Sequence, residues 1–361
     1  VIDLRAHRSY DQEIAGVKRR LPQAFARYLL CGITSVADAG GPMWNFEVRD
    51  LAARTALAPR VAVAGPLVST VARPQLDLGD PPIVKVDSPA EARALVSREA
   101  ERRPDFTKIW FIQRPGDDPA AGRALLDAVV DESRRHGLRV AVHATELAGA
   151  RAAVDAGAAI LVHSVFDQPV DDAFVAAVRD KGVLYVPTLF VTRGYDLVLS
   201  GRFVPTAAER RLADPDALQT IAELPTLPEF KPQPRPQTEE RIKTASDNLR
   251  RLAAAGARIA VGTDAGNIGT LHGPSFFREL RMMVDAGLTP SQVLSAATRG
   301  GARVMGREAE LGTLAPGMLA DLIVLDGDPT IDLGVLEAPR EVVKGGRIVP
   351  QDELRRAAGM P

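Results

Sequence analysis

The sequence predicts an α/β protein whose main part is a (β/α)8 barrel of the TIM-barrel type. Short apolar runs rich in Val and Ile alternate with amphipathic stretches from Val1 to Thr263. The runs are mostly apolar instead of alternating with polar residues, which is typical of parallel strands buried on both faces. Eight such runs with intervening helices favour a closed barrel over an open doubly wound sheet.

Each expected strand is a short apolar run, and most of the intervening helices show a clear amphipathic pattern. The expected strands are Val1–Leu4, Gly32–Ala37, Arg60–Ala64, Phe106–Phe111, Leu138–His143, Ala158–His163, Val183–Pro187 and Arg258–Thr263. The clearest helical patterns are Pro89–Glu101, Ala120–Arg135, Leu147–Ala156 and Glu239–Ala255.

One proline-rich segment interrupts this alternation after the seventh expected strand. Asp214–Gln237 contains Pro215, Pro225, Pro228, Pro232, Pro234 and Pro236. Such a density argues against a regular helix or a central strand. The segment belongs to an insertion at about 205–240, which a barrel would place over the C-terminal mouth where active sites lie. A lid over that mouth and a solvated surface loop both fit this composition.

The C-terminal segment predicts additional strands outside the barrel. The segments ADLIVLD and EVVKGGRIV, within Leu311–Asp326 and Glu341–Val349, have the composition of strands, and Lys344–Arg347 carries a hairpin signal. A closed barrel has no place for them. We therefore expect a barrel over residues 1–305 and a small β-sandwich appendage over 306–361, with the N-terminal half of the sandwich lying before Val1.

Composition excludes several classes of protein. The chain has 45 Lys and Arg against 46 Asp and Glu, so its net charge is −1, which argues against a general nucleic-acid or anionic-membrane binder. The single cysteine, Cys31, excludes an intrachain disulfide framework and a cysteine-rich metal site. No apolar run reaches the length of a membrane span. We expect a cytoplasmic protein that acts on a small molecule, with neither nucleic acid nor membrane as a partner.

Metal-ligating side chains recur at the ends of the expected strands. His7, His143 and His163 each follow or end a strand, Asp264 ends the eighth, and Lys108 lies inside the fourth. The C-terminal ends of barrel strands meet at one mouth, so these residues are expected to be neighbours. A single such histidine is more often a core residue than a ligand. Five suitable side chains on five strands instead favour a site for a divalent metal such as Zn²⁺.

Other residues near the same mouth are candidates for substrate binding. His272 lies in a glycine-rich loop after the eighth strand, where contact with substrate and an ordinary loop position fit equally well. Trp44 could form an apolar wall, although core packing is the commoner fate of such aromatic residues. Tyr195 lies beyond the seventh strand, where its phenol could bind a substrate carbonyl or carboxylate. Asp38 and the following Gly-Gly-Pro turn are weaker candidates.

The chain resembles the amidohydrolase superfamily, specifically its imidazolonepropionase-like and prolidase-like branch. The resemblance rests on IDLRAH, GITSVADAGGP, DFTKIWF, VAVHATELAGARAAVDAGAAILVHS, VPTL, VGTDAG, MMVDAGLTPSQVLSAAT and LGTLAPGMLADLIVLDGDP. The last segment is a specific signature of the β-sandwich that accompanies the barrel in this family. The resemblance implies a metal-dependent hydrolase of amide and related C–N bonds. Its substrate would be a dipeptide, an N-acyl amino acid or a cyclic amide, and association into a homo-oligomer is common in this branch.

The resemblance also implies roles for the five strand-end residues. His7 matches the second histidine of the His-x-His pair on the first strand, and Lys108 matches a lysine that becomes carboxylated and bridges two metals. His143 and His163 match the histidines that hold the second metal. Asp264 matches the aspartate that binds metal and shuttles the proton of the attacking water. A bound divalent ion lowers the pKa of its water to about 7, which supplies hydroxide at neutral pH.

Arg5 departs from the family pattern. The pattern Asp-x-His-x-His reads Asp3-Leu4-Arg5-Ala6-His7 here. A guanidinium group has no lone pair to give a metal and repels a nearby dication, so one metal per chain is favoured over two. Three interpretations follow: a one-metal hydrolase, a barrel in which Arg5 replaces a metal cation as a catalytic group for a non-hydrolytic reaction, or a protein inactivated by an engineered or natural change and retained for ligand binding.

Changing Arg5 to histidine tests the first of these interpretations. If Arg5 alone removes the first metal site, Arg5→His should increase the number of metal ions bound per chain, because the pattern of ligands is then complete. Elemental mass spectrometry of the two purified proteins measures this number. An unchanged metal content would show that Arg5 is not the cause.

Overall fold

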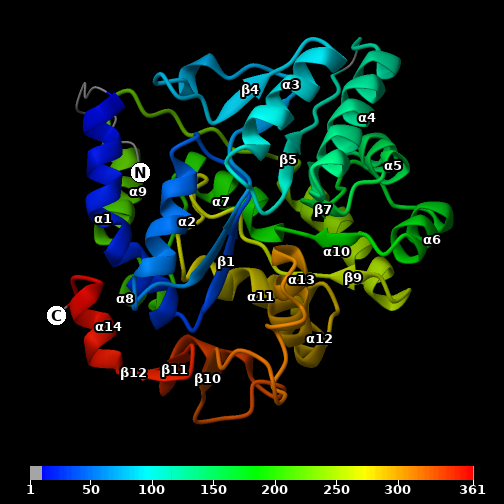
Figure 1. Cartoon of the computed structure of the whole chain (residues 1–361). Helices are drawn as coiled ribbons and strands as arrows, with labels where there is room; N and C mark the ends of the chain where they lie inside the picture. Colours follow the sequence, from blue (N-terminus) through cyan, green and yellow to red (C-terminus); the bar gives the residue numbers. More distant parts are fainter. Residues whose placement is uncertain (1–9, 115, 361) are drawn as a thin grey trace.

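The computed structural model describes residues 10–114 and 116–360. The expected strand Val1–Leu4, together with Arg5 and His7, lies outside these residues. The structure confirms the predicted α/β architecture. Parallel strands follow one another round a ring, with helices on its outside (Figure 1).

The parallel strands belong to two hydrogen-bonded groups. A seven-stranded sheet has the order β4-β3-β5-β6-β7-β8-β9, and β1 pairs with β2. The bounds are β1 Ser35–Asp38, β2 Arg60–Val63, β3 Leu67–Ser69, β4 Ile83–Lys85, β5 Thr107–Trp110, β6 Val140–His143, β7 Ile160–Val162, β8 Leu184–Val186 and β9 Arg258–Ile259. Seven of the eight predicted strands are therefore confirmed, and each is shorter than predicted. Strands β3 and β4 were not predicted.

The two groups of strands are joined by one stretch of chain. Residues 60–69 first pair with β1 as β2 and then, after three residues, pair with β5 as β3. The backbone N–H of Asp105, just before β5, donates to the carbonyl of Val63 at 2.9 Å, which strengthens this junction. Within residues 10–114 and 116–360, β9 and β1 do not pair with each other, so the described strands alone leave the ring open there.

The helices connect the strands and cover the outside of the ring. They are α1 Tyr10–Leu30, α2 Asn45–Arg54, α3 Pro89–Ala100, α4 Pro119–Arg135, α5 Leu147–Ala156, α6 Asp172–Asp180, α7 Leu189–Leu199, α8 Ala207–Leu212, α9 Pro215–Glu223, α10 Thr238–Ala254, α11 Ser275–Asp285, α12 Pro290–Ser295, α13 Gly301–Met305 and α14 Gln351–Ala357. Short helical turns lie at Pro74–Leu76, Leu224–Thr226, Ala296–Gly300 and Leu333–Glu337. The four predicted amphipathic helices are confirmed as α3, α4, α5 and α10.

The prediction for the proline-rich segment was wrong in its first half. Residues Pro215–Glu223 form the regular helix α9. Pro215 occupies the first turn, where a backbone N–H has no partner within the helix, and Asp214 accepts the N–H of Asp216 at 2.9 Å. The next proline comes ten residues later, so it ends the helix without breaking it. Helix α9 lies beside α1 (Figure 1), and Arg20 approaches Asp216 at 3.6 Å.

The C-terminal segment forms one small antiparallel sheet, β10-β11-β12. Its strands are β10 Leu322–Val324, β11 Glu341–Lys344 and β12 Arg347–Val349. The hairpin between the last two turns at Gly345 and Gly346, whose φ angles of 57° and 81° suit a type I′ turn and favour glycine. The described residues thus supply one layer of the expected sandwich.

A buried aspartate holds this sheet against the barrel. Asp321 accepts hydrogen bonds from Arg60 Nε at 2.7 Å and from the backbone N–H of Gly345 at 2.6 Å, and Lys344 Nζ lies 3.5 Å away. Arg60 begins β2, so this group joins the barrel wall to the C-terminal hairpin. These interactions keep the pKa of Asp321 below its usual value despite burial.

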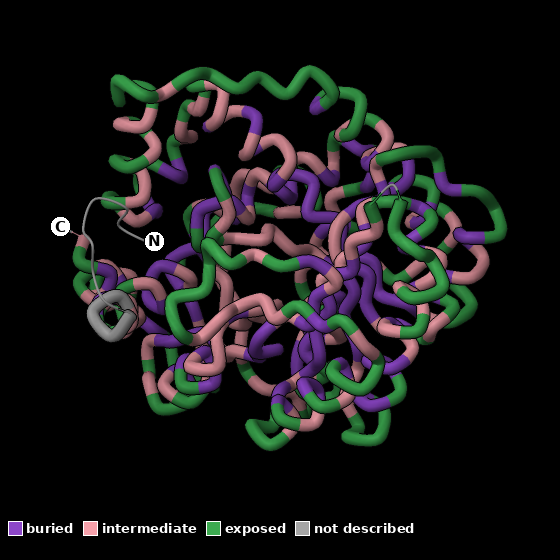
Figure 2. Tube along the Cα trace, turned by 90° about the horizontal axis from the view of Figure 1, so that it is seen from above, coloured by how far each residue is buried: buried purple, intermediate pink, exposed green. Residues whose placement is uncertain are grey.

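The main core lies between the strands and the inward faces of the helices (Figure 2). A second apolar cluster fills part of the ring itself and includes Phe106, Ile160, Leu184, Val186 and Met305. Burial on both faces explains why these strands have almost uniformly apolar sequences.

Glu99 on α3 is a buried carboxylate without a compensating contact. Its residue is 1% exposed, and neither carboxyl oxygen has a hydrogen-bond partner in the described part of the chain. Burial raises its pKa from 4.5 to about 8. The folded protein therefore keeps a proton that the unfolded chain releases above pH 4.5, so stability falls as the pH rises towards 8.

Replacing Glu99 with glutamine should remove this penalty. Glu99→Gln changes the free energy of unfolding at both pH values. We expect this change to be more stabilising at pH 8 than at pH 4.5 by about 1–3 kcal/mol. Urea unfolding at both pH values measures the difference, with exposed Glu101→Gln as the control. Equal effects at the two pH values would contradict the assignment.

Candidate active site

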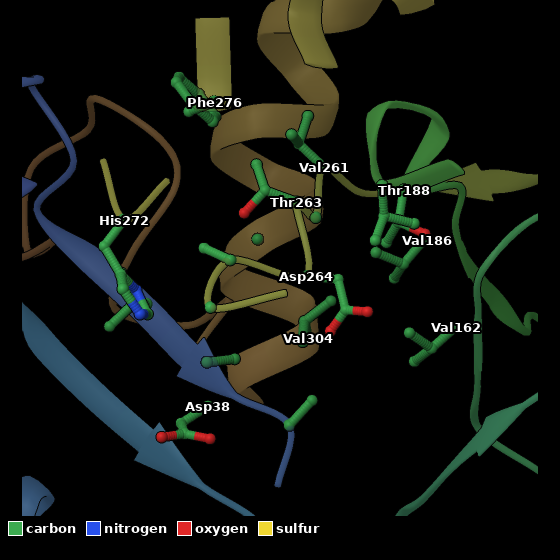
Figure 3. A pocket seen from close by; sticks show the side chains of 18 of the residues that line it. Asp38, Val162, Val186, Thr188, Val261, Thr263, Asp264, His272, Phe276 and Val304 are labelled. Atoms are coloured by element: carbon green, nitrogen blue, oxygen red, sulfur yellow. The ribbon is translucent and has the colours of Figure 1, made fainter. Parts of the chain in front are cut away.

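The structure brings together four of the five predicted strand-end residues. Lys108 lies on β5, His143 ends β6, His163 follows β7 and Asp264 lies beyond β9. All four line one cavity of about 1510 Å³ that runs from the C-terminal ends of the strands to the apolar side chains at the base of the ring. Figure 3 shows Asp264 within this cavity, with Thr188 on one side and His272 on the other.

The two histidines lie against each other. Their ring centroids are 4.5 Å apart, and His163 Nε2 lies 4.0 Å from Asp264 Oδ2. The ring of Trp110 contacts that of His143 edge to face at 5.9 Å. Burial lowers the pKa of His163 to about 4 and that of His143 well below its usual value. Both imidazoles are therefore neutral at pH 7 and retain a lone pair.

Lys108 is an amine in an unusual environment. Its residue is 3% exposed, and it makes no hydrogen bond or ion pair with the described residues. Burial lowers its pKa to about 8, while the negative charge of Asp264 opposes this shift. A substantial neutral fraction therefore exists near physiological pH, and a buried cation without a partner would be costly.

Asp264 is held in place by its own loop. Asn267 Nδ2 donates to Asp264 Oδ2 at 2.7 Å, and Asn267 Oδ1 accepts the hydroxyl of Tyr195 at 2.6 Å. Thr270 Oγ1 donates to the Asp264 carbonyl at 2.9 Å. Asp264 Oδ1 has no protein donor among the described residues, so it remains available to accept or release a proton.

Unusual backbone conformations concentrate at this site. The described non-glycine residues with positive φ are Arg103, His163, Thr188 and Asp264, and the last three, at 77°, 46° and 52°, belong to the site. Each costs about 1–3 kcal/mol, which neighbouring contacts must offset. Such strain aims side chains of consecutive strand ends at a common point, and its concentration here indicates a functional site.

Thr188 was not among the predicted site residues. Its Oγ1 is hydrogen-bonded to His163 Nδ1 at 2.7 Å, so Nε2 is the ring nitrogen that faces Asp264. The buried carboxylate of Glu279 accepts the backbone N–H groups of Leu189 and Phe190, both at 2.8 Å, and thereby fixes the start of α7 directly after Thr188. The segment VPTL, which contains Thr188, was the available sequence signal.

The predicted substrate-binding residues all line the cavity, with different surroundings. Tyr195 is joined to Asp264 through Asn267, whereas His272 is hydrogen-bonded to the Tyr28 hydroxyl at 2.7 Å. Trp44 packs beside a small apolar cluster, and its buried indole nitrogen has no hydrogen-bond partner among the residues that the structure describes. Their roles in binding substrate stay predictions.

Asp38 lies at the same cavity, but its oxygens are already engaged. They accept the Gly40 N–H at 3.1 Å and the Asn45 amide at 2.9 Å. Burial raises its pKa to about 6. A side chain at Gly41 would displace the Asn45 amide that donates to Asp38.

The donor atoms present fit a divalent metal only with a contribution from Lys108. Within the described residues, no three His, Cys, Asp or Glu side chains form a metal-binding group. Two neutral imidazoles and one carboxylate oxygen nevertheless face one another, and the Lys108 amine, which no described residue pairs, lies on the neighbouring strand. Carboxylation would convert this amine into an anionic oxygen ligand, so we regard the donor set as compatible with the metal.

The match to a family is extensive. The model of the amidohydrolase family matches residues 14–349. This chain belongs to the amidohydrolase family.

Comparisons with individual proteins agree with this assignment. The chain is 27% identical to ochratoxinase from Aspergillus niger over 281 residues, covering 75% of this chain and 51% of that protein. It is 28% identical to imidazolonepropionase from Chromobacterium violaceum over 343 residues, covering 90% of this chain and 67% of that protein. The chain thus spans about half the length of the ochratoxinase.

Solved structures share the fold. A Xaa-Pro dipeptidase with bound methionine has a TM-score of 0.72 and 24% identity, covering 96% of this chain and 81% of that chain. Ochratoxinase of A. niger has a TM-score of 0.71 and 23% identity, covering 93% of this chain and 76% of that chain. In the described part of this chain, no helix has the length and apolar character needed to span a membrane.

Removing the Thr188 hydroxyl should loosen the orientation of His163. Thr188→Val is expected to weaken metal affinity about 10–100-fold, because a metal-ligating histidine depends on the partner of its other ring nitrogen. Titration with a competing chelator measures this affinity, and thermal unfolding shows that the fold is intact. Thr188→Ser retains the hydroxyl and should restore most of the affinity. If the Thr188→Val and Thr188→Ser variants bind metal equally well, the Thr188 hydroxyl does not position His163.

Proposed function

We propose that this protein is a metal-dependent amidohydrolase that cleaves an amide C–N bond of a small molecule. The observation that carries the proposal is the convergence of Lys108, His143, His163 and Asp264 at one end of the parallel strands. Family membership supports the reaction class. Relatives described as ochratoxinase, imidazolonepropionase and Xaa-Pro dipeptidase support a dipeptide, N-acyl amino acid or cyclic amide as the substrate.

His143, His163, Asp264 and a carboxylated Lys108 would hold a divalent ion, most simply Zn²⁺. Such an ion supplies a Lewis acid and lowers the pKa of bound water to about 7. His7 and Arg5 lie outside the described residues, so their contribution rests on the sequence alone. The ligand set of the first metal would include His7, and it would lack a ligand at the position of Arg5.

Asp264 is the proposed proton carrier. Its Oδ2 is fixed by Asn267, while Oδ1 has no described protein donor, and the residue lines the cavity. It can take a proton from attacking water and deliver it to the leaving nitrogen, which must be protonated to depart as an amine. Low pKa values keep His143 and His163 neutral, so these imidazoles do not compete for that proton at pH 7.

The proposed activity can be tested on protein loaded separately with Zn²⁺, Mn²⁺ or Co²⁺. The substrates are N-acyl amino acids, Xaa-Pro dipeptides and cyclic amides, and the measurement is the release of amine or carboxylate. We expect turnover of at least one class that disappears on removal of the metal with a chelator and returns when metal is added. Absence of turnover for every class and metal would overturn the proposal and favour a ligand-binding barrel.

A further inference from the structure

Helix α7 has no capping side chain of its own at its first turn. Thr188 stands directly before the helix, at the position whose side chain most often accepts an N–H group of the first turn. Its φ and ψ angles of 46° and 50° are left-handed, and its hydroxyl makes no such bond. The hydroxyl is hydrogen-bonded to His163 Nδ1 at 2.7 Å instead. Another residue must therefore accept the first N–H groups of α7.

Glu279, on the distant helix α11, supplies this cap. Its two carboxyl oxygens accept the backbone N–H groups of Leu189 and Phe190, one each, at 2.8 Å. A carboxylate also suits the positive end of a helix. Glu279 is fully buried and makes no ion pair with the described residues. Burial raises its pKa to about 7, and the two N–H groups oppose this rise, so they stabilise its charged form.

The helix that carries Glu279 continues directly from the Asp264 loop, which comprises residues 264–274. Helix α11 begins at Ser275, whose hydroxyl accepts the backbone N–H of Leu271 at 2.7 Å and so fixes the end of the loop to the helix. Glu279 lies four residues after Ser275 and therefore on the same side of α11. Through Glu279, the segment that bears Asp264 also holds the start of α7.

Helix α7 meets the Asp264 loop at a second place. Gly194, in the middle of α7, packs so closely against Gly269 that a Cβ atom on Gly269 would lie 2.6 Å from the Gly194 carbonyl oxygen. At the next residue, the Tyr195 hydroxyl donates to Asn267, whose amide donates to Asp264. Contacts at its start and in its middle therefore fix α7 relative to the loop.

We propose that Glu279 is a positioning residue, which orients His163 by capping α7 in place of Thr188. Because Glu279 satisfies the first N–H groups of the helix, the Thr188 hydroxyl is free to bind His163 Nδ1. Glu279 itself makes no hydrogen bond or ion pair with His163, so its effect passes through Thr188. This inference rests on the proposed function, in which His163 binds the metal and Asp264 carries the proton.

A double-mutant cycle tests this role by its effect on metal affinity. Glutamine keeps the shape of Glu279 but presents an NH₂ group to one of the two N–H donors, so Glu279→Gln should weaken metal binding about 10-fold. If the effect passes through the Thr188 hydroxyl, Glu279→Gln should add less than about 2-fold to the loss caused by Thr188→Val. Titration with a competing chelator at pH 8, where Glu279 is mostly ionised, measures the four proteins. Unchanged affinity in Glu279→Gln, or fully additive losses, would overturn the proposal.

Glu209→Gln is the matched control. Glu209 is also fully buried and bound to α11, but its hydrogen bonds go to Arg278 and to the start of α8, not to α7. Its substitution should lower the temperature of unfolding and leave metal affinity unchanged. Glu279→Asp, one methylene shorter, replaces Glu279→Gln if that variant does not fold, and should show the same dependence on the Thr188 hydroxyl. Equal loss of metal affinity in the Glu209 and Glu279 variants would reduce Glu279 to a general structural role.

A measurement without metal separates this inference from the proposed function. Crystal structures of the metal-free wild-type protein and Glu279→Gln show the His163 ring directly. In the variant, we expect the distance from Thr188 Oγ1 to His163 Nδ1 to exceed about 3.5 Å, beyond a hydrogen bond. A displaced ring in a protein whose wild type binds no metal would support the positioning role and contradict the metal-dependent hydrolase. An unmoved ring that keeps the 2.7 Å hydrogen bond would overturn the positioning role.

Discussion

Replacing Lys108 with alanine is expected to abolish both metal retention and amide hydrolysis. The substitution removes the amine that, once carboxylated, would complete the proposed donor set of two imidazoles and one aspartate. Metal affinity should fall by more than about 100-fold. Removing a metal ligand weakens binding at least as much as removing a residue that hydrogen-bonds to a ligand. Elemental mass spectrometry after gel filtration measures the metal that remains bound.

Two further measurements distinguish this role from ordinary packing. Lys85→Ala, which changes an exposed lysine on β4, is the matched control and should retain metal and activity. Formate or acetate added to Lys108→Ala should restore part of the activity, because a small carboxylate can occupy the space left by the side chain. Full retention of metal by Lys108→Ala would mean that Lys108 is only a core residue and that the assigned site is wrong.

The second large effect concerns Asp264. Asp264→Asn should lower kcat for unactivated amides by about 10²–10⁴-fold, because the amide cannot carry the proton from water to the leaving nitrogen. KM should change much less. Asp38→Asn, which alters another carboxylate at the same cavity, is the control and should lower kcat far less.

The leaving group provides a sharper test of this proton transfer. The leaving group of an aryl ester departs as a stable phenolate and does not need a proton from Asp264. Asp264→Asn should therefore slow the hydrolysis of aryl esters less than that of amides. Equal losses for esters and amides would indicate that Asp264 acts only by shaping the site.

Much of the fold follows directly from the sequence, because burial dictates residue type. The uniformly apolar runs around β5, β6 and β7 have no solvent-facing side, and that pattern identified them as parallel strands. Very short pieces such as β3 and β4, of three residues each, carry too little pattern to be predicted. Helix α9 was missed because the number of prolines was weighed without their spacing, and Pro215 suits a first turn.

The site could be predicted only in part. The positions of four residues near strand ends predicted that they lie together, because the parallel strands of a barrel end at one mouth. They are Lys108, His143, His163 and Asp264. Local sequence does not reveal which distant side chain will contact a strand end, so Thr188 and Asn267 were not predicted. The positive φ of Thr188 lies directly before Leu189 and Phe190, whose backbone N–H groups donate to the distant Glu279 on α11. The predictions for Arg5 and His7 fall outside the described residues.

The metal content of the protein, purified without chelator and compared with its hydrolysis of amides, tests the central claim most directly. We predict about one tightly bound divalent ion per chain, with activity proportional to metal content across partly depleted samples. Less than about 0.1 ion per chain after growth in metal-supplemented medium, together with hydrolysis that metal addition does not change, would contradict a metal-dependent site.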